Sequence, residues 1–155
     1  MTTFETRVFL SLRGEGATLA ADGSLLLRVS AEATGGAYSL LELTLAPGQG
    51  APMHVHHRED ELFYVLAGEC EIVDGQGPRI ALPGSVAVFA KGTPHAFRNT
   101  SPAPCRVAIT AVPGGLENFF IALNLAVNSG EATPERLAAI SKEFEIDFLP
   151  QARPN

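Results

Sequence analysis

Short extended segments separated by glycine and proline turns recur through the first 112 residues of the chain. Residues 41–45 alternate between leucine on one side and glutamate or threonine on the other, the pattern of a strand with one buried face. Comparable extended segments are expected at residues 6–13, 25–30, 61–66, 69–73, 79–82, 85–90, 95–99 and 106–112. Short strands at spacings of roughly 8–12 residues with such turns predict a closed or two-sheet all-β architecture.

The pattern changes after residues 113–115, which read Pro-Gly-Gly. Apolar side chains then follow the period of an amphipathic helix at Leu116, Phe119, Phe120, Leu123 and Val127. Thr133 followed by Pro134 predicts the start of a second helix, because threonine is a good N-cap and proline suits the first helical position. Residues 145–149 are expected to return as a short strand, and the last few residues to fray. We therefore predict a β-barrel with a C-terminal helical cover.

Composition narrows the class of protein. The 155 residues are 46% hydrophobic and 18% charged, which predicts one folded domain over residues 1–155. A net charge of −6 without a run of lysine or arginine argues against a nucleic-acid partner. We expect neither a membrane helix nor a secretory signal. The two cysteines, Cys70 and Cys105, suggest no disulfide framework, so we expect reduced thiols in a cytoplasmic protein.

Residues 54–61 carry the strongest chemical signal. His54 and His56 are two positions apart, so on a strand both imidazoles would point to the same side. Glu61 follows after a spacing that allows a short bend to return its carboxylate toward them. Imidazole nitrogen and carboxylate oxygen are the ligands expected for a borderline divalent metal, and we predict a metal site. His95 opens a later strand, from which it would line the same cavity.

The same alternation predicts the surroundings of this site. Phe63 and Val65 share the inward face with Glu61, and Phe97 shares it with His95, so the metal would lie on the polar floor of an apolar cavity. Such a cavity would bind an apolar or aromatic ligand through one or two polar atoms. The candidate pocket residues, for which plain core packing is the alternative, are Met53, Phe63, Phe97, Leu43, Phe119 and Phe120. We expect His57, Glu59 and Asp60 to face solvent or, for His57, to lie behind the ligands.

These residues resemble both motifs of the cupin superfamily. The first motif is complete, with its glycines at Gly48 and Gly68 around the residues His54, His56 and Glu61. The second motif comprises Gly84, Gly92, Thr93, Pro94, His95 and Asn99, and departs from the family at Ala90, where proline is usual. The motifs cover residues 41–112. The stretch 114–120 and the terminal helix are similar to small single-domain bacterial cupins of the quercetin-dioxygenase type.

The resemblance implies a double-stranded β-helix, the cupin jelly roll, over about residues 38–112, with C-terminal helices over about 114–145. It implies one divalent transition metal (Fe, Mn, Ni, Co, Cu or Zn) held by His54, His56, Glu61 and His95. In dioxygenases that resemble this chain, the carboxylate equivalent to Glu61 is the proposed catalytic base. The alternative is a polar, solvated loop, or a cupin that keeps these ligands without using them.

Three functions follow from this resemblance. The first is a dioxygenase-type oxidoreductase that acts on a small enolic or aromatic substrate. The second keeps the metal as a Lewis acid for isomerase, lyase or cyclase chemistry without oxygen. The third is a non-catalytic cupin that binds a small ligand, because one fold hosts many chemistries. We also expect a homodimer, for which the outward-facing Leu62 and Tyr64 are the candidate contacts.

Overall fold

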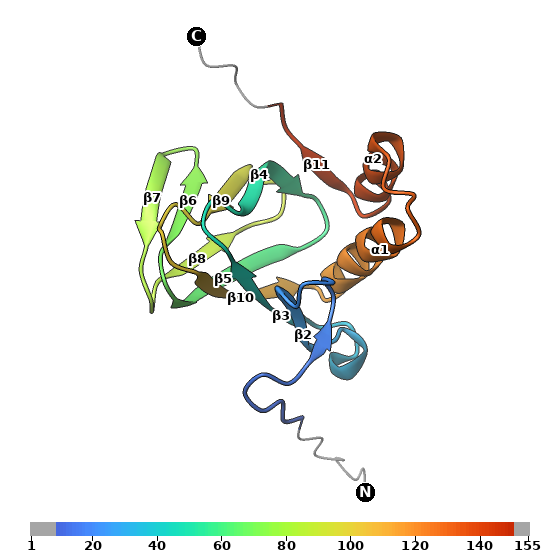
Figure 1. Cartoon of the computed structure of the whole chain (residues 1–155), viewed down its shortest axis with the longest axis horizontal. Helices are drawn as coiled ribbons and strands as arrows, with labels where there is room; N and C mark the ends of the chain where they lie inside the picture. Colours follow the sequence, from blue (N-terminus) through green and yellow to red (C-terminus); the bar gives the residue numbers. More distant parts are fainter. Residues whose placement is uncertain (1–8, 151–155) are drawn as a thin grey trace, which may run out of the picture.

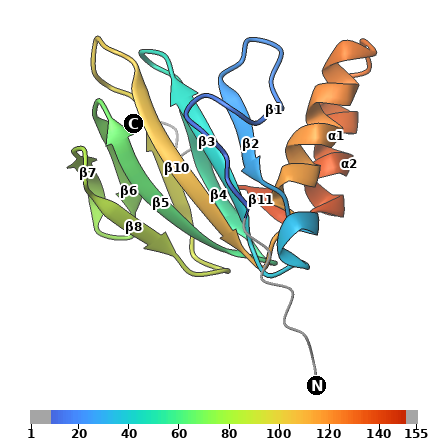
Figure 2. The same ribbon diagram turned by 90° about the horizontal axis from the view of Figure 1, so that it is seen from below.

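We describe residues 9–150 in a computed structural model (Figure 1). Two antiparallel sheets face each other (Figure 2), and we call this pair of sheets the barrel. The first sheet contains, in spatial order, β1 (Ala17–Thr18), β2 (Leu25–Val29), β3 (Ser39–Leu45), β10 (Cys105–Val112), β5 (Asp60–Ala67) and β8 (Val86–Phe89). The second contains β11 (Ile146–Phe148), β4 (Gly50–His56), β9 (His95–Arg98), β6 (Cys70–Asp74) and β7 (Gly77–Ala81). The all-β jelly-roll architecture predicted from the sequence is confirmed.

Alternation along each strand builds the core between the sheets. In β10 every second side chain is buried, from Cys105 to Ala111, while the residues between them are partly exposed. In β5 the buried positions are Glu61, Phe63 and Val65. Because Cα partners in an antiparallel pair share a face, the pairing of Val107 with Val65 and Leu43 brings apolar side chains of three strands together.

Gly68 ends β5 at a point where the backbone leaves no room for a side chain. Its φ is +73°, and a Cβ atom would collide with the carbonyl oxygen of Pro104. Glycine is favoured because it alone adopts this conformation without strain. This explains the second glycine of the first motif as a packing requirement that fixes where β5 turns into β6.

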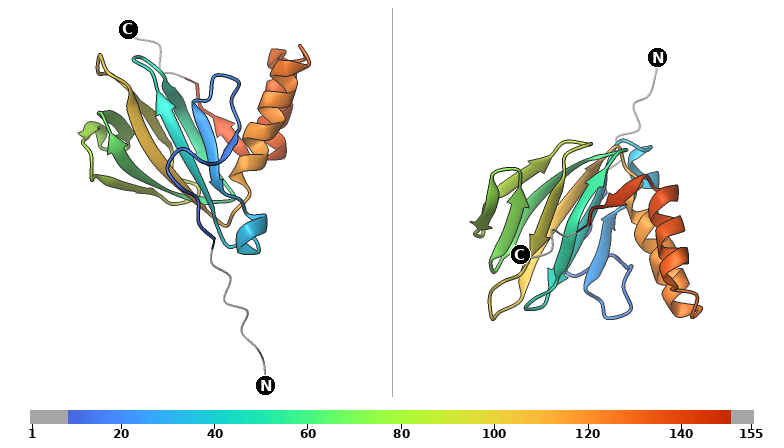
Figure 3. Two further views of the ribbon diagram at one scale, coloured as in Figure 1. Left: turned by 60° about the horizontal axis from the view of Figure 1, so that its bottom comes forward. Right: turned by 90° about the horizontal axis from the view of Figure 1, so that it is seen from above.

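Two helices cover the side of the barrel away from β6 and β7 (Figure 3). They are α1 (Leu116–Asn128) and α2 (Pro134–Glu143), and α2 leads into β11 at the edge of the second sheet. Thr133 caps α2 by accepting a hydrogen bond from the backbone N–H of Arg136 at 3.2 Å. α1 buries Leu116 and Phe119, and α2 buries Ile140, so the helical cover is confirmed. No helix within residues 9–150 has the length and apolar character needed to cross a membrane.

The first expected strand is wrong for the residues that the structure describes. Residues 9–12 form no strand, and Phe9, Leu10 and Leu12 are 59%, 73% and 56% exposed. Alternation in a sequence predicts which side of a strand would be buried, but it does not show whether another strand is available to pair with it. The edge of β2 pairs with residues 17–18 instead. Residues 6–8 of that expected strand, and the terminal residues 151–155 expected to fray, lie outside the described residues.

Candidate metal centre

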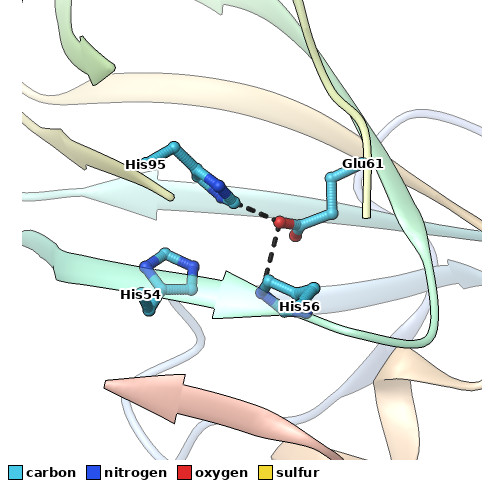
Figure 4. Close-up of side chains that lie close together, drawn as sticks. All are labelled: His54, His56, Glu61 and His95. Carbon is cyan, nitrogen blue, oxygen red and sulfur yellow. Dashed lines mark hydrogen bonds and ion pairs between the residues drawn. The ribbon is translucent and has the colours of Figure 1, made fainter. Parts of the chain in front are cut away.

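Three histidines and one glutamate from three strands converge inside the barrel (Figure 4). His54 and His56 come from β4, His95 from β9 and Glu61 from β5. Each residue offers one ligand atom, and these atoms all lie within 4.8 Å of one another. The exposed fractions of the four residues are only 1–6%. The structure therefore brings together the four residues that the motif spacing predicted.

Strand pairing explains this convergence. His54 and His95 are Cα partners across the β4–β9 pair, so their side chains lie on the same inner face, and His56 joins them two residues along β4. Glu61 reaches the cluster from the opposite sheet, after the short bend that joins β4 to β5. The carboxylate oxygen Oε2 of Glu61 lies 3.2 Å from Nε2 of His56 and 3.0 Å from Nε2 of His95.

The imidazoles of His54 and His95 are oriented by hydrogen bonds at Nδ1, the ring nitrogen that does not face the cluster. Nδ1 of His54 lies 2.7 Å from the carbonyl oxygen of Pro52, and Nδ1 of His95 lies 3.0 Å from the carbonyl oxygen of Thr93. These oxygens only accept hydrogen bonds, so we assign the ring proton to Nδ1 in both residues. The unprotonated Nε2 of each ring then faces the cluster, which is the arrangement that metal-binding histidines adopt.

The contact between Nε2 of His95 and Oε2 of Glu61 shows that the four residues suit a cation. With its proton on Nδ1, a neutral His95 presents a lone pair from Nε2 to the carboxylate oxygen of Glu61 only 3.0 Å away, and no hydrogen bond is possible between two acceptors. A cation between the nitrogen and the oxygen would resolve this contact. The donor set of imidazole nitrogens and one carboxylate therefore fits a divalent transition metal.

Burial keeps His54 ready to act as a ligand. Removal from water lowers the pKa of His54 to about 4, against the opposing effect of the hydrogen bond to Pro52, and the neighbouring His95 and His56 lower it further. His54 is therefore neutral at pH 7, and the neutral imidazole is the form that binds metals.

Aromatic rings surround the ligands, and two of them were missed by sequence reasoning. Phe89 stacks on His95 with ring centroids 3.9 Å apart and an interplanar angle of 4°. Phe148 of β11 stacks on His54 at 5.6 Å. Alternation along β8 could have found Phe89, which is the Cα partner of Glu61. Phe148 could not be found from the sequence, because only the pairing of β11 with β4 places it opposite His54.

The six predicted pocket residues do not lie around one described cavity. Phe63 and Phe97 are 1% and 8% exposed and pack against each other at 4.9 Å, so in this structure they are core residues. Leu43 and Phe120 are partly buried against the same core, and Met53 is partly buried. Phe119 lines an apolar cavity of about 760 Å³ between α1, α2 and β11. A substrate-pocket role for any of the six remains a prediction.

Glu59 corrects one expectation about the bend after His56. It was expected to face solvent, but it is 6% exposed, and its Oε1 lies 2.8 Å from Nδ1 of His56. Side-chain direction within a bend does not follow strand alternation, so alternation could not predict this contact. Asp60 is exposed as expected and accepts a hydrogen bond from the N–H of Lys91. His57 is also at the surface, where it pairs with Asp147 at 2.8 Å.

Comparison with known proteins agrees with this geometry. Residues 41–112 match the family model described as the cupin domain. Quercetin 2,3-dioxygenase of Bacillus subtilis (strain 168) is 28% identical over 130 residues, which cover 78% of this chain and 38% of that enzyme. The chain thus spans well under half the length of this curated relative.

Solved structures share the fold across several reactions. A sugar phosphate isomerase of the cupin superfamily from Silicibacter pomeroyi superposes with a TM-score of 0.50 and 27% identity, over 65% of this chain and 67% of that one. A predicted oxalate decarboxylase from Thermotoga maritima gives 0.54 and 24%, over 57% and 78%. The polyketide cyclase RemF from Streptomyces resistomycificus gives 0.52 and 24%, over 57% and 63%. The two sequence motifs, the two facing sheets and the family match agree that residues 41–112 of this chain are a cupin domain.

Proposed function

We propose that this chain is a metal-dependent oxidoreductase of the dioxygenase type that acts on a small enolic or aromatic substrate. One observation carries the proposal: one nitrogen from each of three imidazoles and a carboxylate oxygen of Glu61 lie within 4.8 Å of one another in a buried cluster. The similarity to quercetin 2,3-dioxygenase supports the choice of reaction. His54, His56, Glu61 and His95 would hold the ion, and Fe, Mn, Ni, Co, Cu and Zn all suit this mixed nitrogen and oxygen set.

The charges around the site support a divalent ion. Glu59 and Glu61 are both buried, and within residues 9–150 their ion-pair partners are histidines alone. Burying carboxylates is expensive unless a positive charge compensates them, and the neutral His54 supplies none. A bound divalent ion would balance the two carboxylates, and it would supply Lewis acidity and, when redox-active, electrons for oxygen chemistry.

In the proposed mechanism, the chain itself contributes the carboxylate of Glu61 and the aromatic rings that border the ligands. A hydroxyl group of the substrate placed beside Oε2 of Glu61 would give its proton to this carboxylate, which is the role of a general base. Phe89 and Phe97 border His95 and His54, so they exclude water and strengthen electrostatic interactions at the ligands. An enolate formed there would be held in a dry, oriented environment.

An apolar cavity supports an aromatic or enolic substrate. The cavity of about 760 Å³ is lined by α1, α2 and β11, including Leu123, Val127 and Phe148. Phe148 also stacks on the metal-ligand candidate His54, so its ring borders this cavity and also contacts the ligand cluster. We propose that the substrate binds in the cavity and that Phe148 contacts its ring.

Oxygen consumption tests the proposed reaction. Protein purified without added metal should contain a transition metal by elemental analysis and consume O₂ with members of a flavonol and diketone panel. Glu61→Ala should lose both metal and activity. Glu117→Ala is the matched control, because Glu117 is also buried but bonds to the backbone N–H groups of Ala31 and Gly115. A metal-loaded wild type that consumes no O₂ with any panel member would contradict the dioxygenase proposal.

A second candidate function is isomerase, lyase or cyclase chemistry without oxygen. The similarity to the sugar phosphate isomerase of Silicibacter pomeroyi favours it. Under this alternative, turnover persists without O₂ and with redox-silent Zn²⁺ in place of the native ion. A third candidate, a non-catalytic binding cupin, predicts tight ligand binding with no turnover in any metal form.

We also propose a homodimer formed through the outer face of β5 and β8. Leu62 and Tyr64 lie beside Val88 and Val86 across this strand pair, and the four side chains are 38–64% exposed. This patch has no charged side chain, so a second copy of a chain with net charge −6 meets it without acidic repulsion. Light scattering should give twice the monomer mass, and Tyr64→Lys should give a monomer; a monomeric wild type would contradict the interface.

The buried free thiols Cys70 and Cys105 support our prediction of a cytoplasmic protein.

A further inference from the structure

The three histidines of the ligand cluster are not oriented in the same way. Nδ1 of His54 and Nδ1 of His95 both face backbone carbonyl oxygens. Nδ1 of His56 instead faces a side chain, the carboxylate of Glu59, with 2.8 Å between Nδ1 and Oε1. His56 is thus the one ligand candidate of the three whose Nδ1 is bound by a side chain and not by a backbone carbonyl oxygen.

Glu59 occupies a position that is unfavourable for a carboxylate without a specific role. Its side chain is 8% exposed, and within the described part of the chain its ion-pair partner is His56. Burying a carboxylate with one hydrogen-bond partner costs free energy that apolar packing at the same position would not. The adjacent cation does not compensate it, because the guanidinium of Arg58 binds Glu145 at 3.3 Å and the carbonyl oxygen of Glu143 at 2.7 Å.

We propose that Glu59 is a positioning residue for the metal site, an inference that rests on the proposed metal-dependent function. By accepting the hydrogen bond from Nδ1–H of His56, the Glu59 carboxylate holds the ring so that Nε2 faces Glu61. A carboxylate behind an imidazole also makes the opposite nitrogen a stronger donor to a metal than a carbonyl does. His56 becomes the strongest of the three nitrogen donors.

Glu59 acts from outside the ligand cluster. It approaches His56 through Nδ1, on the side of the ring away from Glu61, and it borders a separate small cavity of about 150 Å³ beside Gly115 and Leu116 at the start of α1. A substrate at the metal would therefore not touch Glu59. Its effect passes through the orientation and donor strength of His56.

Metal affinity and ligand-field spectra test this role with Co²⁺ as the probe. Co²⁺ affinity is measured by competition with a chelator, together with the visible absorption of the Co²⁺ form and the melting temperature of the metal-free form. Glu59→Ala should weaken Co²⁺ binding on the order of 10–100-fold and change the visible spectrum. Glu59→Gln should lie between Glu59→Ala and the wild type, because the amide oxygen still accepts from Nδ1–H.

Glu117→Ala is the control for loss of a buried glutamate. Glu117 is 4% exposed, and its hydrogen bonds within residues 9–150 come from backbone N–H groups, so its removal should lower the melting temperature and leave Co²⁺ affinity and spectrum unchanged. Co²⁺ binding by Glu59→Ala within twofold of the wild type, with an unchanged spectrum, would overturn the inference. An equal loss of affinity in Glu117→Ala would overturn it as well. A wild type that binds no Co²⁺ would contradict the proposed function itself.

Discussion

His54 and His95 lie directly opposite each other on the paired strands β4 and β9, with ring centroids 4.4 Å apart. This relationship makes the site depend on strand register. A slip of one residue would turn His95 to the outer face while His54 stayed inside. The candidate metal centre therefore depends on how β4 and β9 pair in the second sheet, and it should form only in the folded chain.

The buried His54 should make the stability of the metal-free protein depend on pH. Its pKa is about 4 in the folded protein, against an ordinary value of 6.5, so between these values the unfolded chain binds more protons. The free energy of unfolding should therefore fall as pH decreases from about 6.5 to about 4, by roughly 3 kcal/mol. Urea unfolding across this range measures it.

The control for this pH dependence is a pair of histidine variants. His54→Gln should flatten the dependence between pH 6.5 and 4, whereas His57→Gln, at an exposed position, should leave it as in the wild type. Equal slopes for the wild type and His54→Gln would show that His54 titrates normally.

Phe89 should contribute strongly to stability because it joins the core to the ligand cluster. It is 5% exposed and packs on His95 at 3.9 Å and on Phe63 at 5.2 Å. Phe89→Ala should destabilise the metal-free protein by about 3–5 kcal/mol, the range for a buried phenylalanine, as measured by urea unfolding. Phe148→Ala, which removes a ring that is 48% exposed, should cost much less. A loss below about 1 kcal/mol for Phe89→Ala would contradict this packing.

The cysteines should be unreactive in the folded protein. Burial raises the pKa of Cys70 to about 12 and raises that of Cys105, so almost no thiolate, the reactive form, is present at pH 8. Iodoacetamide should label neither residue in the native state and both in guanidinium chloride, as mass spectrometry would report. Rapid labelling of the native protein at either position would be inconsistent with two fully buried thiols.

Most of the fold was predictable because the signals are local. Alternation within residues 41–45 and the helical period from Leu116 to Val127 each specify an element without knowledge of its neighbours, and α1 spans Leu116–Asn128. Thr133 marked the start of α2 for the same reason. Residues 9–12 show the limit of this reasoning, because a strand also needs a free edge with which to pair.

The four residues that cluster in the candidate site were predictable from the sequence, but the residues around them were not. His54, His56 and Glu61 are close in sequence, and motif spacing identified His95. Glu59, Phe89 and Phe148 were missed as contacts of the histidines because their positions depend on a bend and on pairing between distant strands. These contacts follow from tertiary structure, which a single sequence does not display.

The central claim is that three imidazoles and one carboxylate hold a single metal ion, and metal content in His56→Ala tests it most directly. Wild type and His57→Ala, purified without added metal, should contain about one transition-metal ion per chain by elemental analysis, and a stoichiometry near one follows from a single ligand cluster. His56→Ala should lose most of this metal and the melting-temperature increase that the ion gives to the native state. An unchanged metal content in His56→Ala would contradict the account.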